Sequence, residues 1–425
     1  MNRVSDSASP SSSTPAASAQ FALRTVLMVF LLFLSRLYVF DHPIPVHGDE
    51  VGFIEGLGFP APYPVHHPGY PLWVAVGTLN NSLGLAPYVA FQFWSVFGSI
   101  AAPWLLYVGL RQLAPDGLAW WTALAFGLNP LIWFTSVTAL TYTTAIAFGI
   151  LIVGHCWQAV SRQNAPRLIH AGSALAICIW LRLDYLAWLG PLFLYSIWRL
   201  RRHGGWRALI PVVVSLAFLV PVILLLYGRI STGRRLTGQF SYWLEVLFAT
   251  SVFKLGAVDG LLRSTAKLGG ILLWVLGPVI PAACLALFAF GRIRRRWPGA
   301  IPFLLLWGTP LTAFVLLIHM SEPGHIIPLV PAAYCMFCVG IQCFARPATA
   351  ARIASALALC SAVQFLGYRW STQAVGWRKT LNAKIAYLSA SGLRQIDHRW
   401  DIHTPSDIWP TAVHHPTATR PQLPR

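Results

Sequence analysis

The apolar run Phe21–Phe40, FALRTVLMVFLLFLSRLYVF, and the loop Asp41–Glu50 that follows it, DHPIPVHGDE, decide the fold. About twenty residues of α-helix rise roughly 30 Å, which is the thickness of the hydrocarbon core of a bilayer. No small-residue cleavage site follows the run, so we expect an uncleaved span rather than a signal peptide. The run predicts a first transmembrane helix, and the loop, which contains no lysine or arginine, is expected to face outward.

The composition of the whole chain is that of a membrane protein. Hydrophobic residues make up 56% of the 425 residues and charged residues only 10%, against about 25% in an ordinary soluble domain. A soluble fold of this length would need more charged residues to cover its surface, and a disordered chain would not be this apolar. The sequence therefore predicts an all-α polytopic membrane protein.

The charge balance is strongly basic, with 31 Lys and Arg against 13 Asp and Glu. In a soluble protein this excess would suggest nucleic-acid binding. Here the arginines cluster between apolar runs, as the positive-inside rule predicts for cytoplasmic loops, so we expect membrane lipids and no nucleic acid as partners. The cysteines lie inside apolar runs, and we expect Cys335 and Cys338 to pack in the core rather than to bind a metal.

The alternation of apolar runs and arginine clusters predicts eleven spans, with the N-terminus inside and the C-terminus outside. The spans are expected at 21–40, 86–110, two within 112–161, and at 168–182, 185–198, 208–227, 268–290, 301–319, 325–344 and 353–367. They form a membrane domain over residues 21–367 with two large outer loops, 41–85 and 228–267. We expect an interfacial or re-entrant helix at Gly69–Leu83. Residues 1–20 are expected to be a disordered cytoplasmic tail, and residues 368–425 a short extracytoplasmic tail.

The first outer loop contains the most informative polar residues. Asp49 and Glu50 are adjacent, and His66 and His67 follow in the same loop. Two adjacent carboxylates repel each other, which raises the pKa of one of them where water is limited. A carboxylate with a raised pKa is suited to act as a general base near pH 7. The alternative is a solvated loop with ordinary acids, and the pattern favours chemistry.

These features together resemble the GT-C superfamily of integral membrane glycosyltransferases. The resemblance rests on Gly48-Asp49-Glu50 after the first span and on His67-Pro68-Gly69-Tyr70-Pro71, which opens the interfacial helix. The branch that contains protein O-mannosyltransferases and lipid A aminoarabinose transferases has an Asp-Glu pair and a His/Lys-Pro-Pro-Leu-Tyr-like motif in these places. This chain has glycine at the second proline position. The order of spans is also similar over residues 21–345, including a long outer loop between the seventh and eighth spans.

The resemblance implies a GT-C-like bundle with juxtamembrane helices in the first outer loop. It also implies transfer of a sugar from a polyprenyl-phosphate donor to an acceptor hydroxyl of a lipid, glycan or protein on the outer face. In that scheme Asp49 is the general base, and the acceptor attacks the anomeric carbon in line with the departing phosphate, which inverts its configuration. Glu50 orients Asp49 or the acceptor, and His66, His67 and Tyr70 contribute to substrate binding.

The departing phosphate requires cations, and the sequence offers two groups of them. Arg182 and Asp184 lie at the outer end of a span, where they face a polar cavity or form a purely structural pair. The outer loop 228–267 carries six basic and two acidic residues, against the positive-inside trend, and its Arg234 and Arg235 are the expected phosphate ligands. Attraction to anionic lipid head groups is the alternative for that loop.

Two further residues near span ends are less directly linked to the phosphate. His325 opens the tenth span, where superfamily members often have an Arg-Tyr-Leu-Leu-Pro-like box, and we expect it to donate at most one hydrogen bond. Arg36, late in the first span, is expected to snorkel to the interface. No metal-ligand spacing appears and no cofactor is identified, and a divalent cation is left open.

Two other functions fit part of the sequence. A transporter or flippase of lipid-linked intermediates would be expected to show an internal repeat and acids within its spans, and the sequence shows no such repeat and almost no such acids. A catalytically inactive GT-C-like scaffold is not excluded by the sequence. The basic, Trp-rich single chain indicates a bacterial inner membrane, with the site facing the periplasm.

Overall fold

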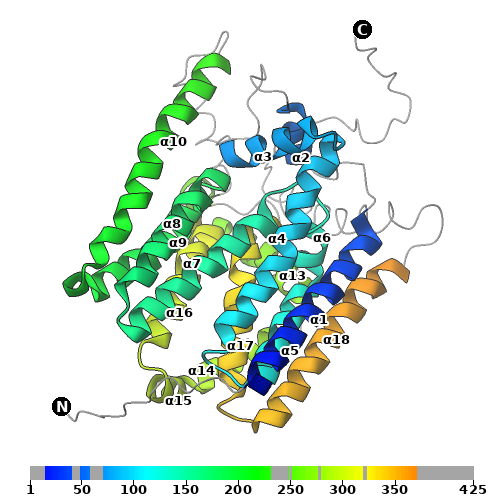
Figure 1. Cartoon of the computed structure of the whole chain (residues 1–425), viewed down its shortest axis with the longest axis vertical. Coiled ribbons are helices and arrows are strands. Elements are labelled where there is room, and N and C mark those ends of the chain that lie inside the picture. The colour runs from blue at the N-terminus through cyan, green and yellow to red at the C-terminus, as the bar shows by residue number, and fades with distance from the viewer. Residues whose placement is uncertain are drawn as a thin grey trace.

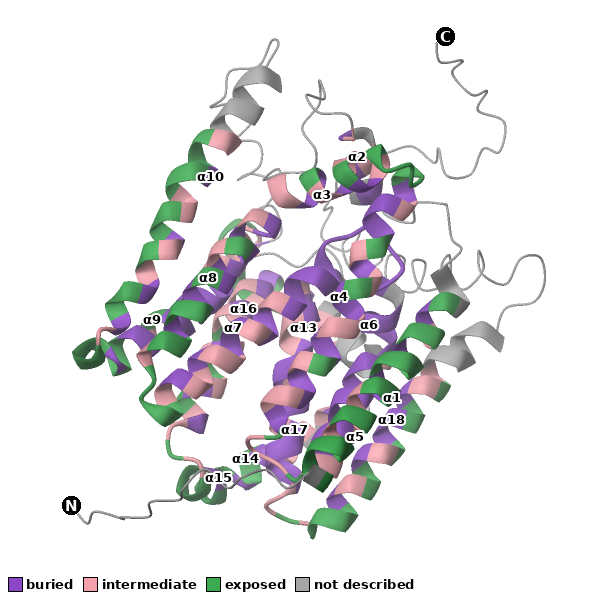
Figure 2. Cartoon of the chain, viewed as in Figure 1, coloured by how far each residue is buried: buried purple, intermediate pink, exposed green. Residues whose placement is uncertain are grey.

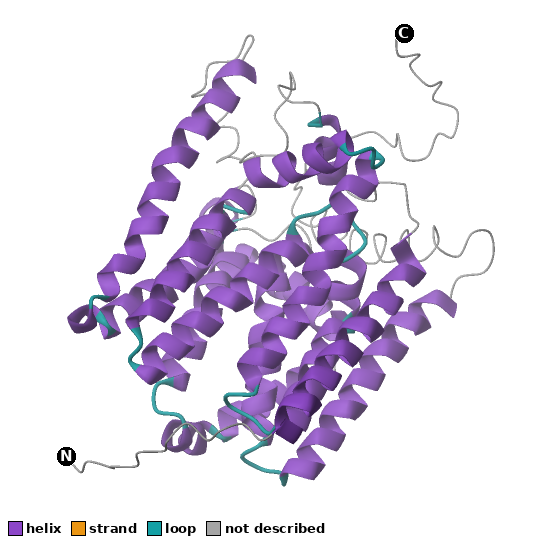
Figure 3. Ribbon diagram, viewed as in Figure 1, coloured by secondary structure: helices purple, strands orange, loops and turns teal. Residues whose placement is uncertain are grey.

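The computed structural model describes residues 15–40, 48–57, 70–230, 248, 251–275, 279–318 and 323–370. These residues form helices joined by short connections, with no strand among them (Figure 3). Six segments of the described chain are long and apolar enough to cross a bilayer: Ala16–Leu37, Pro87–Leu110, Tyr142–Arg162, Gly205–Ile223, Ala300–Leu317 and Gly324–Ile341. The all-α membrane fold is confirmed, and the number of eleven crossings stays a prediction.

The order of elements follows the expected succession of spans and loops. The first half contains α1 (Pro15–Phe40), α2 (Gly48–Glu55), α3 (Pro71–Ser82), α4 (Pro87–Leu110), α5 (Asp116–Gly127), α6 (Pro130–Thr135), α7 (Tyr142–Arg162), α8 (Ala165–Leu181), α9 (Asp184–Arg199), η1 (Arg201–His203), η2 (Gly205–Ala208) and α10 (Leu209–Ile230). The second half contains α12 (Val252–Leu255), α13 (Ala257–Val275), α14 (Val279–Phe288), α15 (Phe290–Arg296), α16 (Ala300–Leu317), η3 (Pro323–Leu329), α17 (Val330–Ile341) and α18 (Pro347–Trp370).

Several helix boundaries differ from those expected. Helix α1 begins at Pro15, inside the expected disordered tail, because a proline in the first turn and the alanines after it favour a helix. Helix α13 begins at Ala257, inside the expected loop 228–267, with Asp259 in its positively polarised first turn. Helix α18 runs to Trp370 and is longer than its expected span. The rest of the expected C-terminal tail lies outside the described residues.

The helices place the acidic and the basic segments at opposite ends of the bundle. Helices α2 and α3 lie at one end, which we call the first-loop end, and the arginine-rich α15 lies at the other (Figure 1). Asp116 lies at the start of α5, where it accepts from Arg24 and from Arg111, whose Nε is 2.7 Å away. This separation agrees with the positive-inside pattern, and the sidedness itself stays a prediction.

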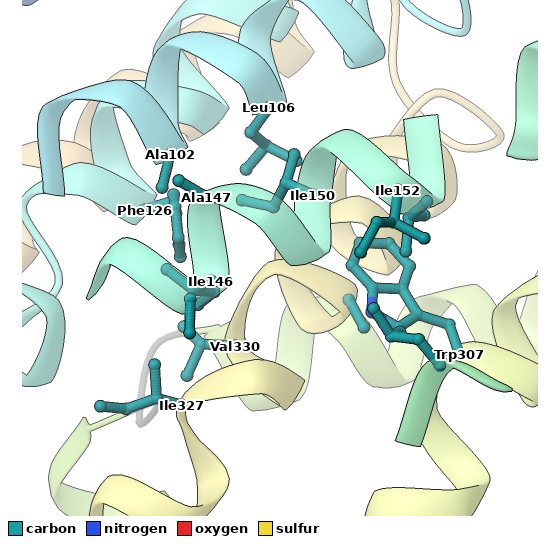
Figure 4. Packing of buried hydrophobic residues seen from close by; sticks show 14 of the residues in the cluster. Ala102, Leu106, Phe126, Ile146, Ala147, Ile150, Ile152, Trp307, Ile327 and Val330 are labelled. Carbon is teal, nitrogen blue, oxygen red and sulfur yellow. The ribbon is translucent and has the colours of Figure 1, made fainter. Parts of the chain in front are cut away.

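The centre of the bundle is built on close packing of α4 against α7. A Cβ atom at Gly98 would lie 2.5 Å from backbone atoms of Thr144, so only glycine allows the two backbones to come this close. The Thr144 hydroxyl donates to the Trp94 carbonyl at 2.8 Å across the same contact. Figure 4 shows apolar side chains of α4, α5 and α7, among them Leu106, Phe126 and Ile146, packed in the interior.

The faces turned away from this core are apolar. Helices α1 and α10 expose large hydrophobic side chains along their outward sides (Figure 2), such as Leu23, Val26, Val213 and Phe218. Such a surface would be unfavourable in water and is the surface expected against lipid. Multi-pass membrane residence therefore follows from the burial pattern as well as from the sequence.

The α4–α7 contact predicts unequal effects on stability for two glycine substitutions in one helix. Gly98→Ala should lower the free energy of unfolding by about 1–3 kcal/mol, because the new methyl group overlaps the α7 backbone. Gly109→Ala is the matched control, since nothing lies within 4 Å of a Cβ at that position. Unfolding in mixed detergent micelles measures both, and equal stability of the two variants would contradict the close packing.

The expected sidedness predicts where fused reporters are active. A reporter fused after Arg202 or Arg296 should be cytoplasmic, and one fused after His66 or Arg234 should be periplasmic, because arginine clusters are retained inside. Paired alkaline phosphatase and fluorescent protein fusions measure this. A periplasmic signal after Arg296 would contradict the proposed order of spans.

Candidate functional site

The candidate site surrounds the connection 136–141, between α6 and α7 at the first-loop end. All of its residues are buried although they are not helical, so their backbone groups need partners within the protein. Side chains of α3 and α4 supply them. Val137 O accepts from Tyr88 Oη at 3.2 Å and from Gln92 Nε2 at 2.8 Å, Leu140 O accepts from Ser95 Oγ at 2.8 Å, and Ala139 O accepts from Trp73 Nε1 at 3.3 Å.

Glu50 fixes α2 to this connection. Its side chain is fully buried, and Oε1 accepts from the Ala139 N–H at 3.1 Å. The hydroxyl of Tyr88 lies beside this carboxylate. Because this carboxylate is buried and hydrogen-bonded, it fixes the position of α2 and does not interact with bulk solvent. Asp49 precedes it in the same helix, and the Asp49 side chain lies outside the described part of the structure.

Arg182 and Asp184 form a forked ion pair between α8 and α9. Arg182 Nη2 lies 2.7 Å from Asp184 Oδ2, and Nε lies 3.2 Å from both carboxylate oxygens. Arg182 is 5% exposed, whereas the Asp184 side chain is 30% exposed. The Asp184 carboxylate therefore compensates the buried guanidinium with an opposite charge.

Aromatic rings enclose the Arg182 guanidinium and connect it to the first outer loop. The guanidinium carbon lies 4.6 Å from the Tyr142 ring centroid and 5.7 Å from that of Tyr70, within the range of cation–π attraction. Nη1 also donates to Thr141 Oγ1 at 3.4 Å. Arg182 therefore contacts the end of the same connection that Glu50 contacts at Ala139.

Tyr70 has a strained backbone at the start of α3. Its φ of 42° and ψ of 56° are left-handed, a conformation that costs a non-glycine residue about 1–3 kcal/mol. The ring packs edge-on against Phe53 of α2 at 5.4 Å between centroids, and Pro71 begins the helix as the sequence predicts. The strained backbone therefore occurs at a residue that begins α3 and whose ring contacts both α2 and Arg182.

The 3₁₀ turn η3 lies beside this cluster. A Cβ at Gly324 would be 2.3 Å from Cζ of Tyr142, so Gly324 contacts the ring that stacks on Arg182. His325 follows it and is half-buried. The structure thus brings Glu50, Tyr70, Arg182, Asp184 and the turn that carries His325 to one end of the bundle. His66, His67, Arg234 and Arg235 lie outside the described residues.

An apolar groove of about 250 Å³ is lined in part by Trp188, which packs near Arg182. It lies between α9, α12 and α16, and its lining includes Trp188, Phe253, Pro310, Phe314 and Leu317. Trp188 links the groove to the Arg182–Asp184 pair, because its ring centroid lies 5.8 Å from the Arg182 guanidinium carbon. The sequence alone did not indicate this groove, since its lining residues come from three separate segments.

Two buried arginines also differ from expectation. Arg36 does not snorkel: its side chain is fully buried and hydrogen-bonded inside the bundle. Arg263, placed by the sequence in a polar loop, is fully buried in α13. The burial of Arg36 could have been predicted from its position inside a span, where a charge normally faces the protein interior.

Within the described part of the chain, no group of three or more His, Cys, Asp or Glu residues is placed to hold a metal ion.

Comparisons with known proteins identify the fold. No protein-family model matches the chain, and no curated protein matches it by sequence. The crystal structure of ArnT from Cupriavidus metallidurans bound to undecaprenyl phosphate is similar, with a TM-score of 0.53 and 16% sequence identity over 89% of this chain and 76% of that chain. ArnT from the same organism in the apo state gives a TM-score of 0.53 and 16% identity, over 90% of this chain and 76% of that chain.

A weaker similarity is to the apo oligosaccharyltransferase of Archaeoglobus fulgidus, with a TM-score of 0.43 and 12% identity over 89% of this chain and 56% of that chain. ArnT is a GT-C membrane glycosyltransferase. The similarity to ArnT therefore confirms the expected GT-C-like fold for this chain.

Proposed function

We propose that the chain transfers a sugar from a polyprenyl-phosphate-linked donor to an acceptor hydroxyl at the outer face of the membrane. The observation that carries the proposal is that one connection, 136–141, contacts both α2, which carries Asp49 and Glu50, and the Arg182–Asp184 pair beside an apolar groove. A carboxylate base, a cation and an apolar channel are the three elements that this reaction needs. The GT-C-like fold supports the same activity.

The proposed chemistry is a single inverting displacement. Asp49 accepts the proton of the acceptor hydroxyl as its oxygen forms a bond to the anomeric carbon. The bond between that carbon and the phosphate oxygen breaks, and polyprenyl phosphate leaves with the bonding electron pair. Glu50 supports the base indirectly, because its bond to Ala139 fixes the helix on which Asp49 lies. Cations near the leaving phosphate stabilise the charge that develops on it.

The groove is the proposed site of the isoprenoid chain. Its lining is aromatic and aliphatic, which suits a hydrocarbon, and Trp188 places the groove beside Arg182. Since the fork of Arg182 is occupied by Asp184, the phosphate also needs Arg234 and Arg235 from the second outer loop. The structure of ArnT with undecaprenyl phosphate supports a lipid phosphate of this class as ligand.

A transferase assay with purified protein tests the function. The donors are polyprenyl-phosphate sugars, supplied with lipid, glycan and protein acceptors, with and without a chelator to test the divalent cation. The expected product has inverted anomeric configuration and appears together with free polyprenyl phosphate. A parallel liposome assay measures movement of the lipid-linked sugar across the bilayer, and movement without transfer would support the flippase instead.

The general-base assignment predicts unequal effects for the two acids of α2. Asp49→Asn keeps the shape and loses proton acceptance, so turnover should fall about 10²–10⁴-fold while donor binding persists. Glu50→Gln should cost less, because an amide oxygen can still accept from the Ala139 N–H. Activity per folded molecule and donor affinity are measured together. Full activity of Asp49→Asn would refute the mechanism.

The phosphate-ligand assignment predicts a donor-specific defect in the second outer loop. Replacing Arg234 and Arg235 by Ala should raise the donor KM, since each charged hydrogen bond to phosphate contributes about 1.5–3 kcal/mol. Lysine at both positions should rescue only part of the affinity, because it cannot make a bidentate contact. Unchanged donor kinetics would assign the two arginines to lipid head groups.

A further inference from the structure

Arg36 is a fully buried arginine near the first-loop end of α1. Its Nη2 donates to the Gly127 carbonyl at 2.6 Å, its Nε to Ser99 Oγ at 3.2 Å, and its Nη1 to Ser35 Oγ at 2.7 Å. The guanidinium carbon also lies 5.8 Å from the Trp133 ring centroid. One side chain therefore contacts α4, the end of α5 and α6.

These partners explain how the charge is accommodated. Gly127 is the last residue of α5, so its carbonyl belongs to the negatively polarised end of that helix and has no partner within the helix. A cation placed there compensates both the unsatisfied carbonyl and the helix dipole. The cost of burying a guanidinium is offset by donors directed at fixed acceptors and by the Trp133 ring.

The contacts of Arg36 continue toward the candidate site. Trp133 Nε1 donates to the Ser35 carbonyl at 3.0 Å, so α1 holds α6 as well as the end of α5. Helix α6 leads directly into the connection 136–141. The Ala139 N–H of that connection donates to Glu50 at 3.1 Å. A continuous series of contacts thus joins Arg36 to the helix that carries Asp49.

We infer that Arg36 is a positioning residue for the proposed reaction: by fixing the end of α5 and α6, it fixes the connection 136–141 and, through Glu50, the orientation of α2. This role rests on the proposed function. It differs from phosphate binding, because the guanidinium is inside the bundle and its donors are directed at Gly127, Ser99 and Ser35. Misplacement of a reacting group by about 1 Å is enough to lower turnover roughly 10²-fold.

The test compares Arg36→Met, Arg36→Lys and a control at the other end of the same helix, Arg24→Met. Arg24 pairs with Asp116 and is remote from the connection, so its loss reports on the general effect of removing an arginine from α1. Arg36→Met should lower kcat about 10²-fold with the donor KM unchanged within a factor of two. Arg36→Lys should recover part of kcat, because lysine can still donate to the Gly127 carbonyl. Arg24→Met should leave kcat per folded molecule unchanged.

A second measurement does not depend on transferase activity. Hydrogen exchange of the amides of residues 136–141 should be at least tenfold faster in Arg36→Met than in the wild type, and unchanged in Arg24→Met. If Arg36→Met fails to fold, Ser99→Ala removes one of its partners and should give a smaller change of the same kind. Unchanged exchange in 136–141, or a raised donor KM with normal kcat, would overturn the inference. Absence of transfer by the wild type would refute the proposed function, and the exchange data would still decide the role of Arg36.

Discussion

The need to satisfy the backbone of the buried connection 136–141 determines the arrangement of the first-loop end. A non-helical segment in a low-dielectric interior cannot leave its carbonyls without partners, since each unpaired group costs several kcal/mol. Side chains of α3 and α4 donate to these carbonyls, and Glu50 of α2 accepts from the N–H of Ala139. Because these hydrogen-bond partners come from three different helices, the connection determines where α2 and α3 lie relative to the bundle.

The two arginines beside this connection are compensated in different ways. Arg182 is paired with a carboxylate, so the pair is close to neutral. The hydrogen-bond partners of Arg36 in the described structure are a carbonyl and two hydroxyls, all of them neutral. The Arg36 guanidinium is therefore compensated by dipoles, and the Arg182 guanidinium by an opposite charge.

The sequence predicted the helices better than it predicted the contacts between them. The apolar run at 86–110 corresponds to α4, and Pro71 opens α3 as expected, because length, hydropathy and proline position are local properties. The snorkelling expected of Arg36 was wrong, because its partners Ser99 and Gly127 come from other helices. A residue near the end of a span can turn to the interface or to the bundle, and only the packing decides which.

The same reasoning applies to the candidate site. The adjacent pair Asp49-Glu50 is visible in the sequence, but the proposed division of roles between its members rests on the contact of Glu50 with Ala139, which the sequence gives no reason to select. The groove needs α9, α12 and α16 together, so no single motif could indicate it.

The strained Tyr70 connects the two halves of the proposed site. Its ring contacts Phe53 of α2 on one side and the Arg182 guanidinium on the other. Glu50 and Thr141 form a second link between the same halves, through the connection 136–141. Two independent links leave α2 and the Arg182–Asp184 pair little freedom to move apart. The proposed in-line displacement would require such a fixed distance between the base and the leaving group. The surrounding contacts thus hold Tyr70 in its unfavourable backbone conformation, and this conformation helps to fix the geometry of the proposed site.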